Sequence, residues 1–214
     1  MWRWLRILWL TAATVVLAGL VVHRSHVRPA QVGSSEDLAT GIILVATPDL
    51  GDPHFSQTVV LIVHYDEHQG AVGLILNRTT DTVVSKIFPQ FKLAKDDPVF
   101  EGGPVESSSA QALIRTRTKP EGGTRVIGEV YASGNKGFIE KSVSSGAGRA
   151  TFRLYAGYAG WGPDQLEKEI DAGGWSLLHA TPDIVFDDKP DTLWQRMQHD
   201  SDTRIAMIEQ LEHR

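Results

Sequence analysis

Short runs of apolar, largely β-branched residues recur along the chain, separated by polar or glycine-containing connections. Early in the chain they occupy residues 40–48, 58–65 and 70–77. Runs of this length that end at turn residues are typical of buried strands, and the polar connection DEHQ predicts that the second and third form a hairpin. Further strands are expected at residues 97–105, 110–116, 125–133, 150–157 and 175–180.

Apolar residues at helical spacing appear in fewer places. They predict helices at residues 83–88, 136–146, 163–172, 192–197 and 201–214. Strands outnumber helices and do not alternate with them regularly, so the pattern indicates an α+β fold with a mixed, largely antiparallel sheet.

Three glycines stand close together in the stretch GYAGWG, at residues 157–162. Ordered glycine costs backbone entropy, so the stretch needs a structural reason. We expect the strand to end at Gly157, a tight turn with Gly160 at positive φ, and a helix from Pro163. A valine at Gly160 is then expected to destabilise the fold. The alternative is an anion site at the amides of that helix, but the glycine spacing matches no phosphate-binding loop.

Residues 1–28 differ in character from the rest of the chain. Residues 7–22 contain no charge and three tryptophans lie at one end of this region, which favours a membrane-spanning helix over residues 5–22. A cleaved signal peptide and a misassigned start codon are the alternatives. Residues 29–37 are small and polar and predict a tether, and the globular domain is expected at residues 38–214.

Charge and cysteine content exclude several classes of function. Residues 1–30 hold four of the 21 basic residues and no acid, which leaves 17 basic and 26 acidic residues, a net charge of −9, in residues 31–214. A domain this acidic is a poor partner for phosphate backbones, so direct nucleic-acid binding is not expected. The chain contains no cysteine, which excludes disulfides, thiolate chemistry and cysteine-based metal sites.

Histidines near carboxylates suggest two kinds of chemistry. His64 and His68 flank an acidic pair in HYDEH, as metal ligands would, but they lie at a predicted strand end and turn, which favours solvated side chains. His54 lies near Asp52 and Ser56, as an acid–base pair or nucleophile would, but Gly-Asp and Asp-Pro are turn formers. No nucleophile elbow, zinc-protease helix or Walker loop occurs, so we expect no catalytic residue, metal or cofactor.

The motifs GIILVATPDLGDPHFSQTVV, GAVGLILNR, FEGGPV, ASG and GYAGWGPDQLEKEI occur in this order along residues 38–195. Together they resemble the YqgE/AlgH family of bacterial proteins. The resemblance implies an α+β fold whose sheet curls into a partial barrel with flanking helices. It implies no reaction, and the usual label of the family is transcriptional regulator.

Members of that family are typically cytoplasmic and start near the first strand, whereas this chain has 37 residues ahead of the predicted domain. The difference favours a single-pass protein of a bacterial inner membrane. Basic residues nearly balance on the two sides of the apolar stretch, so the side on which the globular domain lies stays open.

Three glycine-containing segments, TPDLGDPHF, EGGPV and GYAGWG, each follow or connect a predicted strand. In a curled sheet such loops can gather at one end, and loops on a rigid scaffold commonly carry binding residues. Backbone amides there favour an anionic or polar group, although Asp52 and Glu101 oppose a highly charged one. We therefore expect one shared ligand-binding cleft lined by Pro48, Asp52, Phe55, Gly102, Gly103, Tyr158 and Trp161.

These observations favour a non-enzymatic binding or regulatory domain tethered to a membrane through residues 5–22, with an unknown protein or small-molecule partner. A cytoplasmic transcriptional regulator and a membrane-tethered enzyme are the alternatives.

Overall fold

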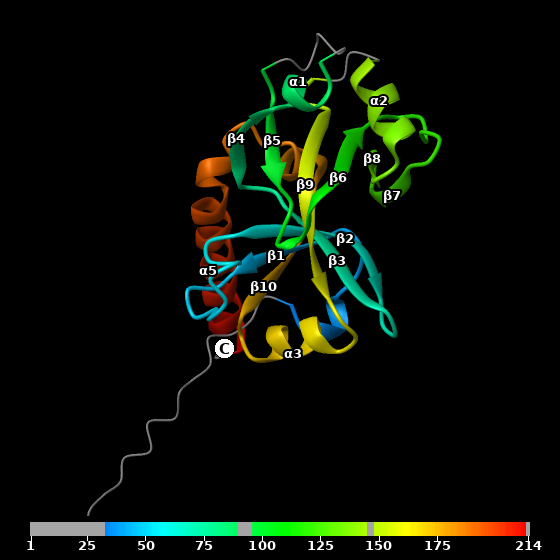
Figure 1. Cartoon of the computed structure of the whole chain (residues 1–214). Coiled ribbons are helices and arrows are strands. Elements are labelled where there is room, and N and C mark those ends of the chain that lie inside the picture. The colour runs from blue at the N-terminus through cyan, green and yellow to red at the C-terminus, as the bar shows by residue number, and fades with distance from the viewer. Residues whose placement is uncertain (1–32, 90–95, 145–147, 213–214) are drawn as a thin grey trace, which may run out of the picture.

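The strand β9 (Phe152–Trp161) connects the two halves of a ten-stranded sheet. Its first half lies between β5 (Pro98–Glu101), which runs parallel to it, and β6 (Val105–Arg115), which runs antiparallel. Its second half pairs with β3 (Gly70–Ile75). In Figure 1 β9 runs through the middle of the molecule from the upper half to the lower half.

The computed structural model describes residues 33–89, 96–144 and 148–212. The predicted anchor over residues 5–22 lies outside these residues. Among the helices that are described, none is both long enough and apolar enough to span a membrane. The remaining elements are β1 (Ile42–Ala46), β2 (Val59–Asp66), β4 (Thr79–Val83), α1 (Val84–Ile87), β7 (Thr124–Ile127), β8 (Val130–Ser133), α2 (Lys136–Ser144), α3 (Gln165–Asp171), β10 (Trp175–His179), α4 (Pro182–Val185) and α5 (Leu193–Glu212), with 3₁₀ turns at Ser35–Asp37 and Pro190–Thr192.

The strands follow the order β10-β1-β2-β3-β9-β6-β8-β7, with β5 also on β9 and β4 on the far side of β5. All the pairs are antiparallel except β5 with β9. The curled sheet with flanking helices confirms the expected α+β class and the mixed, largely antiparallel arrangement (Figure 1).

Strand β1 is buried on both faces, which explains its unbroken apolar sequence IILVA. Ile43 and Val45 face a core cluster that includes Leu193 and Met197 of α5. The alternate residues of β1 face a second cluster that α3 covers. Because successive side chains of a strand point to opposite faces, one helix on each side buries the whole strand.

Several boundaries differ from those expected. Residues 125–133 form two strands, β7 and β8, because Gly128 adopts a φ of +42° and turns the chain between them. The two predicted C-terminal helices are a single helix, α5, because the polar residues between them are also helical. Strand β6 begins at Val105, earlier than expected, and helix α4 follows a Thr181 cap that the pattern did not indicate.

Candidate functional site

The expected turn in GYAGWG is wrong, because β9 continues through it to Trp161. Gly160 is not among the residues with positive φ, and it pairs with Val72 of β3. A Cβ atom built on Gly160 would have Tyr158 Cε2, at 3.4 Å, as its nearest neighbour, an ordinary contact. The expected loss of stability for Gly160→Val, which required a positive φ, therefore does not hold.

Gly157 is the glycine that bends β9. Its φ is +70°, and a Cβ atom built there would lie 2.8 Å from the carbonyl oxygens of both Gly103 and Val105. A side chain at this position would be strained by the backbone and would also meet two fixed oxygen atoms.

Gly102 and Gly103 pack against the same bend from the other side. A Cβ atom on Gly102 would lie 2.2 Å from the carbonyl oxygen of Gly157, and one on Gly103, whose φ is +151°, would lie 2.3 Å from the amide nitrogen of Ala159. We call Gly102, Gly103 and Gly157 the glycine junction. Close packing of backbone on backbone accounts for all three glycines.

Two of the predicted aromatic residues lie in the core beside α3. The rings of Phe55 and Trp161 stack with centroids 5.4 Å apart, and Trp175 meets both rings edge-on, at 5.5 and 6.0 Å. Phe55 is 7% exposed and Trp161 is 4% exposed. Glu169 Oε2 accepts hydrogen bonds from the indole nitrogens of Trp161, at 3.0 Å, and Trp175, at 2.9 Å. This carboxylate fastens α3 to the rings beneath it.

The structure thus brings five of the seven predicted residues together in two groups. Phe55 stacks on Trp161, while Gly102 and Gly103 pack against the β9 bend, where Tyr158 is half-buried. The other two residues, Pro48 and Asp52, are exposed on the loop before β2. None of the seven lines the described cavities of about 170, 390 and 470 Å³.

The loop before β2 is held by the residues that follow β3. Arg78 donates to the carbonyl oxygens of His54, at 2.7 Å, and Ser56, at 3.0 Å, and Asn77 donates to that of Gln57, at 2.9 Å. Arg78 also lies 3.5 Å from the carboxylate of Glu101, next to the glycine junction. The first two glycine-containing segments are therefore linked through one arginine.

The carboxylates beside His54 and His68 accept hydrogen bonds from backbone amides of the turns in which they lie. Asp52 Oδ1 accepts from the backbone amide of His54, at 2.8 Å, so it caps a turn instead of orienting the imidazole. In the part of the chain that the structure describes, no group of three or more histidine, aspartate or glutamate residues is placed to hold a metal ion.

A feature that sequence reasoning missed is backbone strain next to the glycine-containing segments. Gln57, Glu106 and Asp164 have φ values of 55°, 46° and 57°, and no other non-glycine residue in the described ranges has a positive φ. Each of the three lies just past one of the three glycine-containing segments, and each is exposed. A left-handed conformation costs a non-glycine residue about 1–2 kcal/mol. No sequence signal marked these residues except their position next to those segments.

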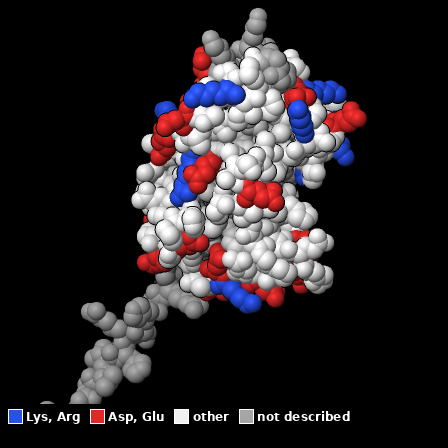
Figure 2. All heavy atoms as spheres, viewed as in Figure 1, with Lys and Arg blue, Asp and Glu red and all other residues white. Residues whose placement is uncertain are grey.

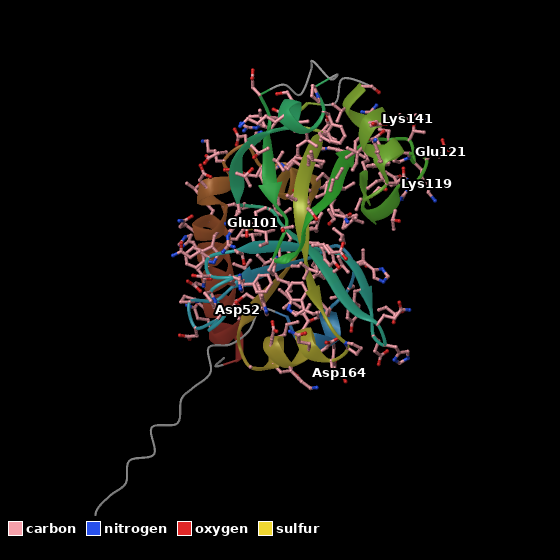
Figure 3. All side chains as sticks on the ribbon, in the orientation of Figure 1. Asp52, Glu101, Lys119, Glu121, Lys141 and Asp164 are labelled. Carbon is pink, nitrogen blue, oxygen red and sulfur yellow. The ribbon has the colours of Figure 1, made fainter. Side chains whose placement is uncertain are left out.

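Five exposed residues, Asp52, Gln57, Glu101, Glu106 and Asp164, lie in the three glycine-containing segments or within two residues after them, and we call this set the junction face. Figure 3 labels Asp52, Glu101 and Asp164 in the middle and lower parts of the view. In the same orientation, Figure 2 shows mainly uncharged and acidic atoms in the lower part, with few basic groups. At the helix amides, which were considered as an alternative anion site, α3 begins only at Gln165 and the Gly162 amide already donates to Gln165 Oε1, at 3.1 Å.

The comparisons with known proteins all indicate the same family. Residues 43–206 match the family described as DUF179, AlgH-like. A UPF0301 protein of Streptomyces avermitilis is 36% identical over 180 residues, which cover 79% of this chain and 90% of that protein. A UPF0301 protein of Streptomyces coelicolor is 34% identical over 174 residues, with the same coverage of each chain.

Solved structures agree with this result. The solution structure of the AlgH protein from Pseudomonas aeruginosa has a TM-score of 0.64 at 27% identity, covering 79% of this chain and 91% of that one. The crystal structure of protein DIP2367 from Corynebacterium diphtheriae has a TM-score of 0.65 at 25% identity, covering 75% and 86%. Because the family match spans nearly the whole described fold and the relatives align over most of their length, this chain belongs to the YqgE/AlgH family.

Proposed function

We propose that this protein is a non-enzymatic binding domain, held at a bacterial inner membrane by residues 5–22, that presents the junction face to a protein partner. The observation that carries the proposal is that three strained, exposed polar residues, Gln57, Glu106 and Asp164, each follow one of the three glycine-containing segments. Strain of this kind is kept where the surrounding structure enforces it, and it clusters at binding and switch sites.

The charge of the junction face indicates the kind of partner. Four of its five residues are acidic, and the whole of residues 31–214 carries a net charge of −9. Among the described residues, only Glu101 of these four forms an ion pair, with Arg78, and at 3.5 Å on the surface that pair neutralises little. A basic or uncharged protein surface is complementary to this face, whereas nucleic acid and anionic lipid would be repelled.

The backbone of the face supports recognition by a protein. The hydrogen bonds from Asn77 and Arg78 hold the loop before β2, and the glycine junction holds the segment that carries Glu101 and Glu106. A face set on rigid elements loses little conformational entropy on binding, which favours affinity.

Site-specific photo-crosslinking in cells tests this proposal. The photoreactive amino acid benzoylphenylalanine replaces Glu101, which is half-exposed and has no backbone strain, in the full chain. We expect a discrete protein adduct from position 101 and none from Lys119, an exposed residue on a different loop. A second change, Glu106→Lys, keeps a long side chain at the strained position but reverses its charge, so the adduct should weaken.

Equal adducts from positions 101 and 119, or an adduct indifferent to Glu106→Lys, would contradict the proposed surface.

A further inference from the structure

A cavity of about 470 Å³ lies between the β4–β5 pair and the corner that follows α4. Among the described residues, neither of its two basic side chains, Arg149 and Lys189, forms an ion pair. Cavities of roughly 300–1,000 Å³ are typical of small-molecule sites. The lining residues are Thr79, Asp96, Pro98, Arg149, Asp188, Lys189, Pro190, Asp191 and Thr192.

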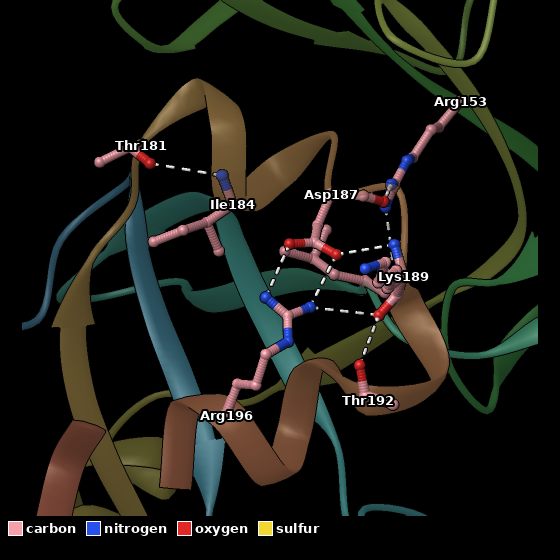
Figure 4. A network of polar contacts seen from close by, with 8 residues as sticks. Arg153, Thr181, Ile184, Asp187, Lys189, Thr192 and Arg196 are labelled. Atoms are coloured by element: carbon pink, nitrogen blue, oxygen red, sulfur yellow. Dashed lines mark hydrogen bonds and ion pairs between the residues drawn. The ribbon is translucent and has the colours of Figure 1, made fainter. Parts of the chain in front are cut away.

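A network of hydrogen bonds holds the corner that carries Lys189 (Figure 4). Arg196 binds the two carboxylate oxygens of Asp187, at 3.0 and 2.7 Å, and the Lys189 amide donates to Asp187 Oδ1, at 2.8 Å. The Lys189 carbonyl oxygen accepts from Arg196, at 3.2 Å, and from the Thr192 hydroxyl, at 3.3 Å. Burial alone would raise the pKa of Asp187, but the hydrogen bonds from Arg196 and the Lys189 amide outweigh it and lower that pKa.

Arg153 ties this corner to the central strand. It is 2% exposed, and its guanidinium donates to the carbonyl oxygens of Leu76, at 3.3 Å, and of Asp187. Its Cζ atom lies 4.6 Å from the ring centroid of Phe100 and 5.9 Å from that of Phe186. The backbone of Lys189 is therefore fixed from two sides, while its side chain is exposed.

Behind the cavity lies a narrow gap with no room for a water molecule, lined in part by Arg153, whose buried Nε has no hydrogen-bond partner among the described residues. The gap shares Pro98 and Arg149 with the cavity, so the two spaces adjoin. The buried guanidinium adds positive potential behind Arg149, because charges in a poorly solvated interior are weakly screened.

Three carboxylates line the same cavity, those of Asp96, Asp188 and Asp191. A ligand that is only anionic would be repelled by these, and a ligand that is only cationic would be repelled by Arg149 and Lys189. A molecule that carries both charges satisfies both sets of side chains.

We propose that this cavity binds a small zwitterion, with its phosphate or carboxylate toward Arg149 and Lys189 and its ammonium group toward Asp188 and Asp191. Both a free metabolite and a zwitterionic lipid headgroup have this chemistry. The site is separate from the junction face and does not depend on the function proposed for that face.

Calorimetry on the full chain in non-ionic detergent tests the proposal with phosphoethanolamine as the probe. We expect saturable binding at one site, at least about tenfold tighter than that of inorganic phosphate or ethanolamine alone, since each half engages only one set of charges. Lys189→Gln should weaken binding at least about tenfold, because it removes a charge-assisted contact. The matched variant Lys119→Gln, on an exposed loop outside the cavity, should bind as the unchanged protein does.

The source of the ligand is distinguished by repeating the titration in lipid nanodiscs. If phosphatidylethanolamine nanodiscs weaken binding of the soluble probe and phosphatidylglycerol nanodiscs do not, the zwitterion is a headgroup; if neither does, it is a free molecule. Either result supports the proposed chemistry. Absence of saturable binding, inorganic phosphate binding as tightly as phosphoethanolamine, or full affinity in a folded Lys189→Gln variant would overturn it.

Discussion

Replacing Gly157 with alanine is expected to destabilise the fold by about 3–5 kcal/mol, because two penalties of about 1–3 kcal/mol each apply at one position. The φ of +70° strains any side chain, and the new Cβ atom would lie 2.8 Å from two carbonyl oxygens that belong to the opposing backbone. Neither oxygen can rotate away, as the end of a flexible side chain would. The free energy of unfolding of the full chain in denaturant measures the effect.

Gly160→Ala is the matched control, three residues further along the same strand. Its Cβ atom would meet nothing nearer than 3.4 Å, and its φ is not in the left-handed region. We expect a change within about 1 kcal/mol, since alanine also restricts the unfolded chain. Equal losses for the two variants would show that the glycine junction does not set the position of these strands.

The second large effect is expected for Glu169→Ala. This change removes the oxygen that accepts hydrogen bonds from both Trp161, at 3.0 Å, and Trp175, at 2.9 Å. The two indoles are 4% and 0% exposed, so water cannot readily replace the lost acceptor. At about 1–3 kcal/mol for each buried donor left without its partner, the variant should lose about 3 kcal/mol of stability.

Two further variants test whether the loss of stability comes from the missing acceptor oxygen. Glu169→Gln keeps an acceptor oxygen and should retain most of the stability, whereas Lys168→Ala changes an exposed neighbour on α3 and should cost no more than about 0.5 kcal/mol. Tryptophan fluorescence during unfolding reports on the affected rings. If Glu169→Ala unfolds at the same denaturant concentration as Lys168→Ala, the carboxylate does not hold the helix to the rings.

Much of the fold could be predicted because strand signals are local. The run IILVA is apolar at every position, and β1 is buried on both faces as that pattern indicates. The hairpin of β2 and β3 was predicted from its polar connection and is confirmed. The turn at Gly128 was missed because apolar residues on both sides continued a strand-like pattern.

The structural role of the junction glycines could not be predicted, because it depends on contacts with backbone far along the chain. Gly103 and Gly157 are separated by more than fifty residues, and only their contact explains why neither can carry a side chain. Local pattern instead indicated a turn at Gly160, which lies inside β9. The third glycine-containing segment contacts the first through Trp161 and Phe55 and the second through Gly157, but Phe55 and Trp161 are core residues packed under α3.

The charged cavity also could not be predicted from the sequence, because segments far apart in the chain line it. Arg149, Lys189 and Asp96 come from three separate connections, and no motif links them. Arg153 occupies an interior position of a strand, is 2% exposed and has its guanidinium over the ring of Phe100. Phe100 and two carbonyl oxygens of distant segments make that burial possible.

Membrane fractionation of the full chain tests the central claim, a binding domain held at a membrane, most directly. After high-pH carbonate extraction, which strips peripheral proteins, the uncleaved chain is expected in the membrane pellet, because residues 7–22 carry no charge. A variant reduced to residues 29–214 is expected in the supernatant. Recovery of the uncleaved full chain in the supernatant, or of a shorter, cleaved chain in the soluble fraction, would contradict the account.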